Sequence, residues 1–102
     1  MDNKGQIEEL VVCRLNTRPD DTAYKAALED TNRWLAAQPG FQWRVSGYTD
    51  DGRLVDRCGW ASTLDAQTAG ARFMDSDAGK AFGAFLDPDG MVMAHYRLAE
   101  RA

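Results

Sequence analysis

His95 is the only histidine in the sequence, and imidazole is the side chain best suited to proton transfer near neutral pH. We expect it on the last strand of the chain, with Met93 and Arg97 on the same strand face. A general acid or base is one interpretation of His95. A surface or interface histidine is the alternative, because no motif ties a nucleophile or a carboxylate to it.

Asp56 is the second candidate for acid–base chemistry. In the predicted strand it shares a face with Leu54, Cys58 and Trp60. If that face is buried, the carboxylate must be paired or protonated, and Arg44 is a possible partner across the predicted hairpin. The alternative is that the face frays to solvent at Asp56, since charged residues are seldom fully buried.

Trp60 is the leading candidate for a substrate-binding residue. It lies at the end of a strand, just before a helix, where a pocket between the helices and the sheet could open. There it would form an apolar wall against a flat substrate, or it would plug the end of the core. Tyr24, Phe73 and Tyr96 are expected in the same helix–sheet layer, with core packing as their default role.

Metal and cofactor chemistry lack their usual signals. One histidine cannot build a zinc site, and Cys13 and Cys58 lack C-x-x-C spacing. The chain contains no phosphate-binding loop, dinucleotide fingerprint or nucleophile elbow. We therefore expect no metal and no cofactor, and two packed, reduced thiols.

Apolar periodicity and capping signals predict the order strand, helix, strand, strand, helix, strand. The second helix should restart at Ser76, and the run Asp87-Pro88-Asp89-Gly90 is typical of a turn. Gly70, Gly79 and Gly83 fall inside the predicted helices, where each costs about 1 kcal/mol relative to alanine. The strands are expected at 7–15, 41–48, 53–60 and 91–98, and the helices at 20–37 and from 63 to about 86.

This order is that of an α+β, ferredoxin-like sandwich in a single domain over residues 1–102. The right-handed crossover rule gives an antiparallel four-stranded sheet of order 4-1-3-2, with both helices on one face. The other face would be left uncovered, although the strands carry apolar residues on both faces. A second copy is the simplest cover, so we expect a homodimer through the open sheet face.

The composition limits the possible partners. The net charge is −4 and no block of basic residues occurs, which argues against nucleic acid. The chain has no basic amphipathic segment and no apolar run of about 20 residues, so the sequence does not predict membrane contact. The polar first residues do not resemble a signal peptide, so we expect a cytoplasmic protein.

Several short motifs resemble one family. A strand that ends in Trp60-Ala61-Ser62 is followed by Asp65-Ala66, Phe73-Met74, Ser76-Asp77 and Phe82, and a Gln38-Pro39-Gly40-Phe41 junction precedes the second strand. Together they resemble the dimeric α+β barrel proteins, most closely the antibiotic biosynthesis monooxygenase-like branch. The resemblance covers nearly the whole chain in topology. It implies a dimeric α+β barrel with a pocket between each sheet and its helices.

The resemblance also implies possible chemistry, because the superfamily includes cofactor-independent oxygenases, haem-degrading oxygenases and lactone isomerases. Haem degradation is disfavoured, since the position of the haem-ligating histidine of those members is Gly70 or its neighbour here. The asparagine that the oxygenases usually place on strand one is not evident, and Glu8 or Glu9 there would be a different chemistry.

Three functions follow as hypotheses. The first is cofactor-independent oxygenation of a small aromatic substrate, with Trp60 as a wall and His95 or Asp56 as the proton handler. The second is a non-catalytic dimer that binds a small aromatic or apolar molecule, or that has a stress-related role. The third is an isomerase or cyclase with one acid–base residue. A pocket of roughly 300 Å³ or more would favour the oxygenase and the isomerase or cyclase. A helix–sheet layer filled by side chains would favour the non-catalytic dimer.

Overall fold

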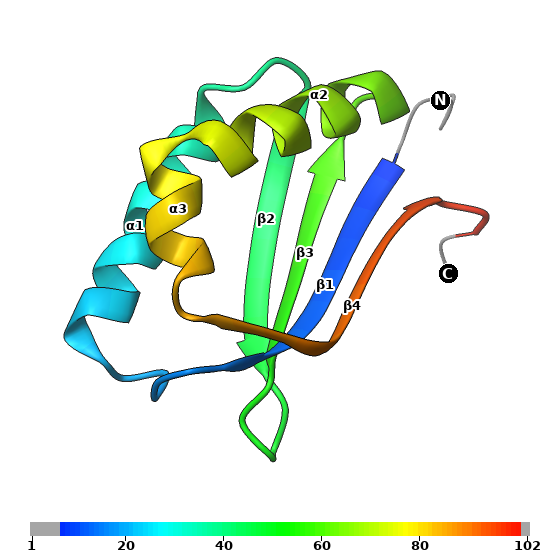
Figure 1. The fold of residues 1–102 in the computed structure, drawn as a ribbon. Coiled ribbons are helices and arrows are strands. Elements are labelled where there is room, and N and C mark those ends of the chain that lie inside the picture. The colour runs from blue at the N-terminus through cyan, green and yellow to red at the C-terminus, as the bar shows by residue number, and fades with distance from the viewer. Residues whose placement is uncertain (1–6, 101–102) are drawn as a thin grey trace.

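The computed structural model describes residues 7–100. Its elements follow the predicted order, with the second helix in two parts (Figure 1). The elements are β1 (Ile7–Leu15), α1 (Thr22–Ala36), β2 (Phe41–Tyr48), β3 (Leu54–Trp60), α2 (Thr63–Asp75), α3 (Asp77–Gly83) and β4 (Leu86–Arg97).

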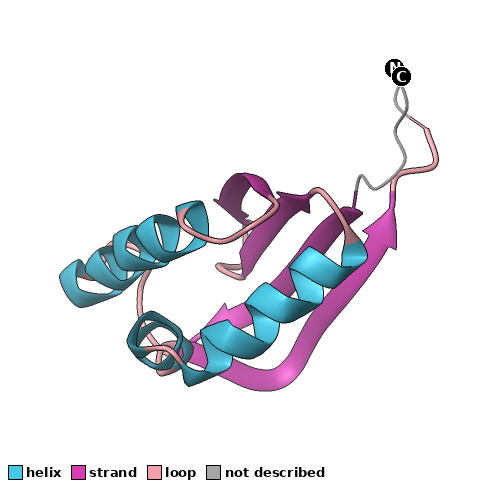
Figure 2. Ribbon diagram, turned by 90° about the horizontal axis from the view of Figure 1, so that it is seen from above, coloured by secondary structure: helices cyan, strands magenta, loops and turns pink. Residues whose placement is uncertain are grey.

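The sheet has the order β2-β3-β1-β4 with antiparallel neighbours, which confirms the predicted topology and the central place of β1. The helices lie on one face of this sheet (Figure 2). There α1 contacts β2, and α2 contacts β1 and β3. The α+β, ferredoxin-like fold is therefore confirmed, with one sheet face bare in the single chain.

The helices begin where short polar side chains can cap them. Ser62 Oγ accepts a hydrogen bond from the backbone N–H of Asp65 at 3.1 Å, and Ser76 Oγ accepts one from Gly79 at 2.9 Å. Asp21 caps α1 in the same way, so that helix begins slightly later than expected. Each cap satisfies a backbone donor that the first helical turn leaves free. Ser76 therefore separates α2 from α3, as the sequence predicts.

The predicted turn before the last strand is wrong. Strand β4 begins at Leu86, and Asp87–Gly90 lies inside it. Arg14 pairs with Asp87, but Val12 pairs with Val92, so β4 carries extra residues opposite Cys13. Such a bulge bends a strand without ending it. Pairing with β1 at both ends of the bulge therefore overrides the local turn signal.

The core between helices and sheet forms two clusters. One surrounds Trp60 and the other surrounds Tyr24, which is fully buried. The first cluster comprises Ile7, Leu35, Cys58, Trp60, Ala66 and Ala69, and the second comprises Cys13, Tyr24, Ala27, Leu54 and Phe82.

Gly79 is required by close packing, so the expectation that alanine would be better there is wrong. A Cβ at Gly79 would lie 1.8 Å from the backbone carbonyl oxygen of Phe73, whereas a Cβ at Gly83 would meet no atom within 4 Å. We expect Gly79→Ala to lower the free energy of unfolding by about 1–3 kcal/mol. The matched Gly83→Ala variant should raise it by about 0.5–1 kcal/mol. Urea denaturation measures both, and equal stabilities would contradict this packing.

Candidate active site

A row of polar side chains crosses the helix-facing side of the sheet. The register places His95 opposite Glu9, Glu9 opposite Cys58, and Cys58 opposite Arg44. Residues directly opposite each other on neighbouring strands point to the same face. All four strands therefore contribute to one row of side chains on the helix-facing side of the sheet.

His95 and Glu9 form the β4 end of this row. His95 Nε2 lies 3.2 Å from Glu9 Oε2, and the side chains are 32% and 19% exposed. Burial raises the pKa of Glu9, the His95 contact lowers it in part, and the nearby Asp56 carboxylate raises it further. A carboxylate with a raised pKa beside an imidazole is suited to accept and return a proton.

The row is open to solvent at the β4 end. Met93, which lies two residues from His95 on the same strand face, is 61% exposed. The helices therefore leave this side of β4 uncovered, and the imidazole is in contact with solvent there.

Asp56 is buried and paired, so the expectation that its strand face frays to solvent is wrong. Arg44 donates from Nε to Asp56 Oδ1 at 2.9 Å and from Nη2 to Oδ2 at 2.7 Å. Ser46 donates a third hydrogen bond at 3.2 Å, and Arg44 also donates to Asn32 at 2.7 Å. The anticipated Arg44 partner is confirmed. Both carboxylate oxygens are engaged, and an acid–base role for Asp56 stays a prediction.

Trp60 borders the Glu9–His95 pair. The side chain is 1% exposed, and its indole N–H makes no hydrogen bond within residues 7–100. The N–H nevertheless lies close enough to the Glu9 carboxylate to lower its pKa in part, although the contact does not meet hydrogen-bond geometry. The structure thus brings three groups together: a carboxylate, an imidazole and an indole.

Tyr24 and Phe73 lie in the helix–sheet layer, as expected, but away from this pair. Burial raises the pKa of Tyr24, whose hydroxyl lies 2.9 Å from that of Tyr48. Its ring stacks on Phe82, and Phe73 packs between Phe82 and Trp34. Both side chains therefore fill the core in this structure, and their substrate-binding role stays a prediction.

Tyr96 lies on the opposite sheet face, so its predicted place in the helix–sheet layer is wrong. Successive strand residues alternate between faces, and Tyr96 pairs with Glu8, whereas His95 pairs with Glu9. The Tyr96 hydroxyl donates to Glu8, which also accepts from Arg57 at 2.7 Å. Arg57 in turn lies over the Trp43 ring, 5.4 Å from its centroid. Tyr96 belongs to the bare face of the sheet.

The cysteines are poorly suited to nucleophilic chemistry. Burial, followed by the charges of Asp56 and Glu9, raises the pKa of Cys58 to about 12. Burial also raises the pKa of Cys13. Both thiols are free and stay protonated at neutral pH. Within the described part of the chain, no group of three or more His, Cys, Asp or Glu side chains could hold a metal ion.

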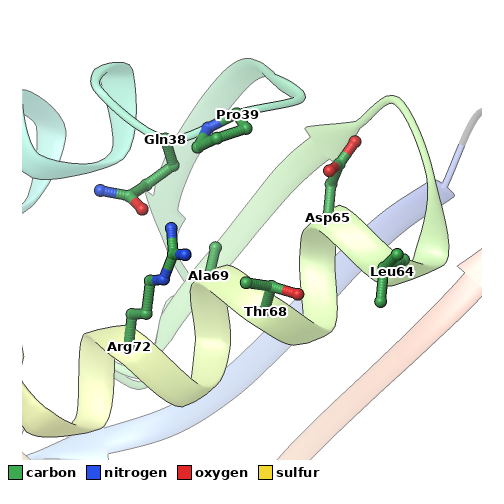
Figure 3. Close-up of a pocket in the computed structure, with 7 residues that line it drawn as sticks. All are labelled: Gln38, Pro39, Leu64, Asp65, Thr68, Ala69 and Arg72. Carbon is green, nitrogen blue, oxygen red and sulfur yellow. The ribbon is translucent and has the colours of Figure 1, made fainter.

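A cavity of about 130 Å³ opens between α2 and the turn that precedes β2 (Figure 3). It lies on the flank of α2 that faces this turn, and β1 passes behind α2 in this view. Its volume is below the roughly 300 Å³ of a typical ligand pocket. The lining residues are Gln38, Pro39, Leu64, Asp65, Thr68, Ala69 and Arg72.

Comparison with solved structures identifies the fold. SnoaB, a cofactor-independent oxygenase from Streptomyces nogalater, superposes with a TM-score of 0.78 at 15% identity, over 95% of this chain and 96% of its own. The monooxygenase ActVA-Orf6 of Streptomyces coelicolor, in complex with nanaomycin D, gives 0.71 at 15% identity, over 99% and 94%. The chain therefore shares the α+β fold of these two proteins.

The same fold also occurs in proteins without an assigned activity. NE2512 from Nitrosomonas europaea, a protein of unknown function, gives a TM-score of 0.68 at 10% identity, over 99% of this chain and 96% of its own. No family model and no curated protein matches the sequence. Within residues 7–100, no helix is both long and apolar enough to cross a bilayer. The fold that the short sequence motifs imply is thus confirmed.

Proposed function

We propose that this protein is a cofactor-independent monooxygenase of a small, electron-rich hydroxyarene, with Glu9 as the proton acceptor. The observation that carries this proposal is the Glu9–His95 pair, 3.2 Å apart beside Trp60 at an edge of the helix–sheet layer. The fold shared with SnoaB, a cofactor-independent oxygenase, supports it. Glu9 takes the role that the sequence-based hypothesis gave to His95 or Asp56, and His95 orients the Glu9 carboxylate.

The reaction needs no external reductant, because the substrate supplies every electron. Glu9 accepts a proton from an activated C–H of the ring system, and the resulting carbanion transfers an electron to dioxygen. Recombination forms a C–O bond, and protonation by Glu9 gives a hydroperoxide. Loss of water then breaks the remaining C–H bond and the O–O bond. A CH₂ group and dioxygen thus become a carbonyl group and water.

Anthrone, a tricyclic substrate with such a CH₂ group, tests this function. Purified protein with a metal chelator and no added cofactor should consume one dioxygen for each quinone formed, faster than buffer alone. An oxygen electrode and the quinone absorbance measure the two quantities. A rate equal to that of the protein-free control would contradict the proposal.

We further propose that the protein acts as a homodimer through the bare sheet face. Val45 and Val92 are exposed there, and Leu10, Val12 and Val55 lie partly exposed beside them. Contiguous apolar surface on a sheet is unfavourable in water, and a two-fold copy buries it most simply.

Val92→Lys should convert this dimer into a monomer, because it places a charge in the apolar contact. We expect the dissociation constant to rise at least about tenfold, since burying an unpaired charge is strongly unfavourable. Leu64→Lys, at an exposed apolar position on α2, is the matched control and should leave the dimer intact. Sedimentation velocity measures both variants, and a monomeric wild-type protein would contradict the dimer proposal.

A non-catalytic binding protein is the second candidate. The filled layer around Tyr24 and the small volume of the described cavity favour it. Binding of anthraquinone without oxidation of anthrone would support this alternative. An isomerase or cyclase would instead use the Glu9–His95 pair without dioxygen, and its product would form equally well under nitrogen.

A further inference from the structure

The cavity between α2 and the turn before β2 is lined by one charge of each sign. The Asp65 carboxylate and the Arg72 guanidinium both lie on its lining, and within residues 7–100 neither group forms an ion pair or a hydrogen bond. The two residues are two helical turns apart on the same flank of α2, about 10.5 Å along the axis (Figure 3). Ion pairs within a helix join residues three or four positions apart. The cavity therefore separates two opposite charges that do not neutralise each other directly.

The Asp65 carboxylate is held at one end of the cavity by the turn before β2. Gly40 in this turn has a φ of +79°, a conformation that favours glycine. Its carbonyl oxygen accepts a hydrogen bond from the backbone N–H of Ala61 at 2.8 Å, which ties the turn to the start of the α2 segment. A Cβ at Gly40 would overlap Asp65 Oδ2. The absent side chain thus lets the carboxylate lie directly against the turn.

The Arg72 guanidinium lies at the other end, beside an amide of fixed orientation. Gln38 Nε2 donates to the backbone carbonyl oxygen of Trp34 at 3.1 Å, and Figure 3 shows Arg72 extended toward the Gln38 amide. Thr68 and the buried Ala69 lie on α2 between the two charged residues. A guanidinium presents its N–H donors in a planar fork that fits a carboxylate. This end of the cavity is therefore suited to an anionic group.

We propose that this cavity binds a small zwitterion, with the ligand carboxylate on Arg72 and the ligand ammonium on Asp65. A simple anion would also face the Asp65 carboxylate, and a simple cation would also face Arg72. Charge complementarity therefore selects a molecule that carries both charges. The volume of about 130 Å³ is that of about four water molecules, which limits the ligand to a short amino acid. Binding at this cavity does not require that the Glu9–His95 pair be catalytic.

Titration of the full-length, isotope-labelled protein with 4-aminobutanoate tests this site, because the short carbon chain of this probe separates its two charges. NMR spectra follow the Gln38 side-chain amide and the backbone amides of Thr68 and Ala69. We expect saturable shifts at these groups with a dissociation constant of about 1 mM, as is usual for so small a ligand. Butanoate and butylammonium each leave one charge of the cavity unpaired, so both should bind at least about threefold more weakly.

Two variants assign the charges. Arg72→Gln should weaken binding of 4-aminobutanoate by about three- to tenfold, because a charged hydrogen bond at a partly solvated position is lost. Asp65→Asn should remove the preference for 4-aminobutanoate over butanoate. Both substitutions preserve size and helix propensity, so the melting temperature should stay close to that of wild type. Lys25→Gln removes one positive charge at an exposed position on α1 and is the matched control, which should bind as wild type does.

The absence of saturable shifts in wild type at about 10 mM 4-aminobutanoate, ten times the expected dissociation constant, would overturn the proposed site. Equal affinities for 4-aminobutanoate and butanoate would overturn the zwitterionic ligand class. Wild-type affinity in Arg72→Gln would overturn the role of the guanidinium. None of these readouts depends on anthrone oxidation, so failure of the zwitterion site and failure of the oxygenase are distinguished.

Discussion

Replacing Asp56 with asparagine is expected to lower the free energy of unfolding by about 3–5 kcal/mol, because the change leaves a buried guanidinium without its counter-charge. The Arg44 and Asp56 side chains are only 5% and 11% exposed, so solvent screens the pair weakly. Two parallel N–H···O contacts join them, which is the strongest geometry for such a pair. Chemical denaturation of both proteins at the same pH measures the difference.

Asp20→Asn is the matched control, because Asp20 pairs with Arg18 at the surface, where both side chains are largely exposed. An exposed pair contributes about 0–1 kcal/mol. The double variant Arg44→Met with Asp56→Leu should recover most of the loss, since apolar residues can replace a buried pair without cost. An Asp56→Asn protein as stable as wild type would mean that the pair is not buried in solution.

Replacing Glu9 with glutamine is expected to lower the rate of anthrone oxidation by about 10²–10⁴-fold, the usual contribution of a positioned general base. Glutamine keeps the size of the side chain and can still accept a hydrogen bond from His95. Steady-state oxygen consumption measures the rate. Glu29→Gln, the same change at an exposed position on α1, is the control and should have the wild-type rate.

The pH dependence provides a second readout for Glu9. A base acts only when deprotonated, and burial raises the pKa of Glu9 above its ordinary value of 4.5. The wild-type rate should therefore fall as the pH decreases through this raised pKa. The residual rate of Glu9→Gln should not show this decrease. An unchanged pH profile in Glu9→Gln would mean that another group accepts the substrate proton.

The fold could be derived from local signals in the sequence. Ser62 and Ser76 are caps that act within a single helical turn, so neighbouring residues suffice to place them. The alternation of β1 also showed which of its side chains share a face. The segment Asp87–Gly90 could not be derived in this way, because its pairing with β1 depends on a distant strand.

The site depended more on register than on residue type. His95 was identified from its chemistry alone, but its partner Glu9 follows only from the pairing of β1 with β4. Tyr96 was assigned to the wrong face because no sequence signal showed which face of the last strand contacts the helices. The Arg44–Asp56 pair could be predicted from the sequence, since a short hairpin joins their strands and leaves few possible registers.

Anaerobic mixing of the protein with anthrone isolates the proton transfer to Glu9 from the steps that need dioxygen. Without dioxygen the reaction must stop after proton transfer, so the bound anthrone anion should accumulate and show its red-shifted absorbance at neutral pH. We expect this signal in wild type and in Glu29→Gln, and its loss in Glu9→Gln. No anion in the wild type, or an equal signal in Glu9→Gln, would contradict the claim that Glu9 starts the reaction.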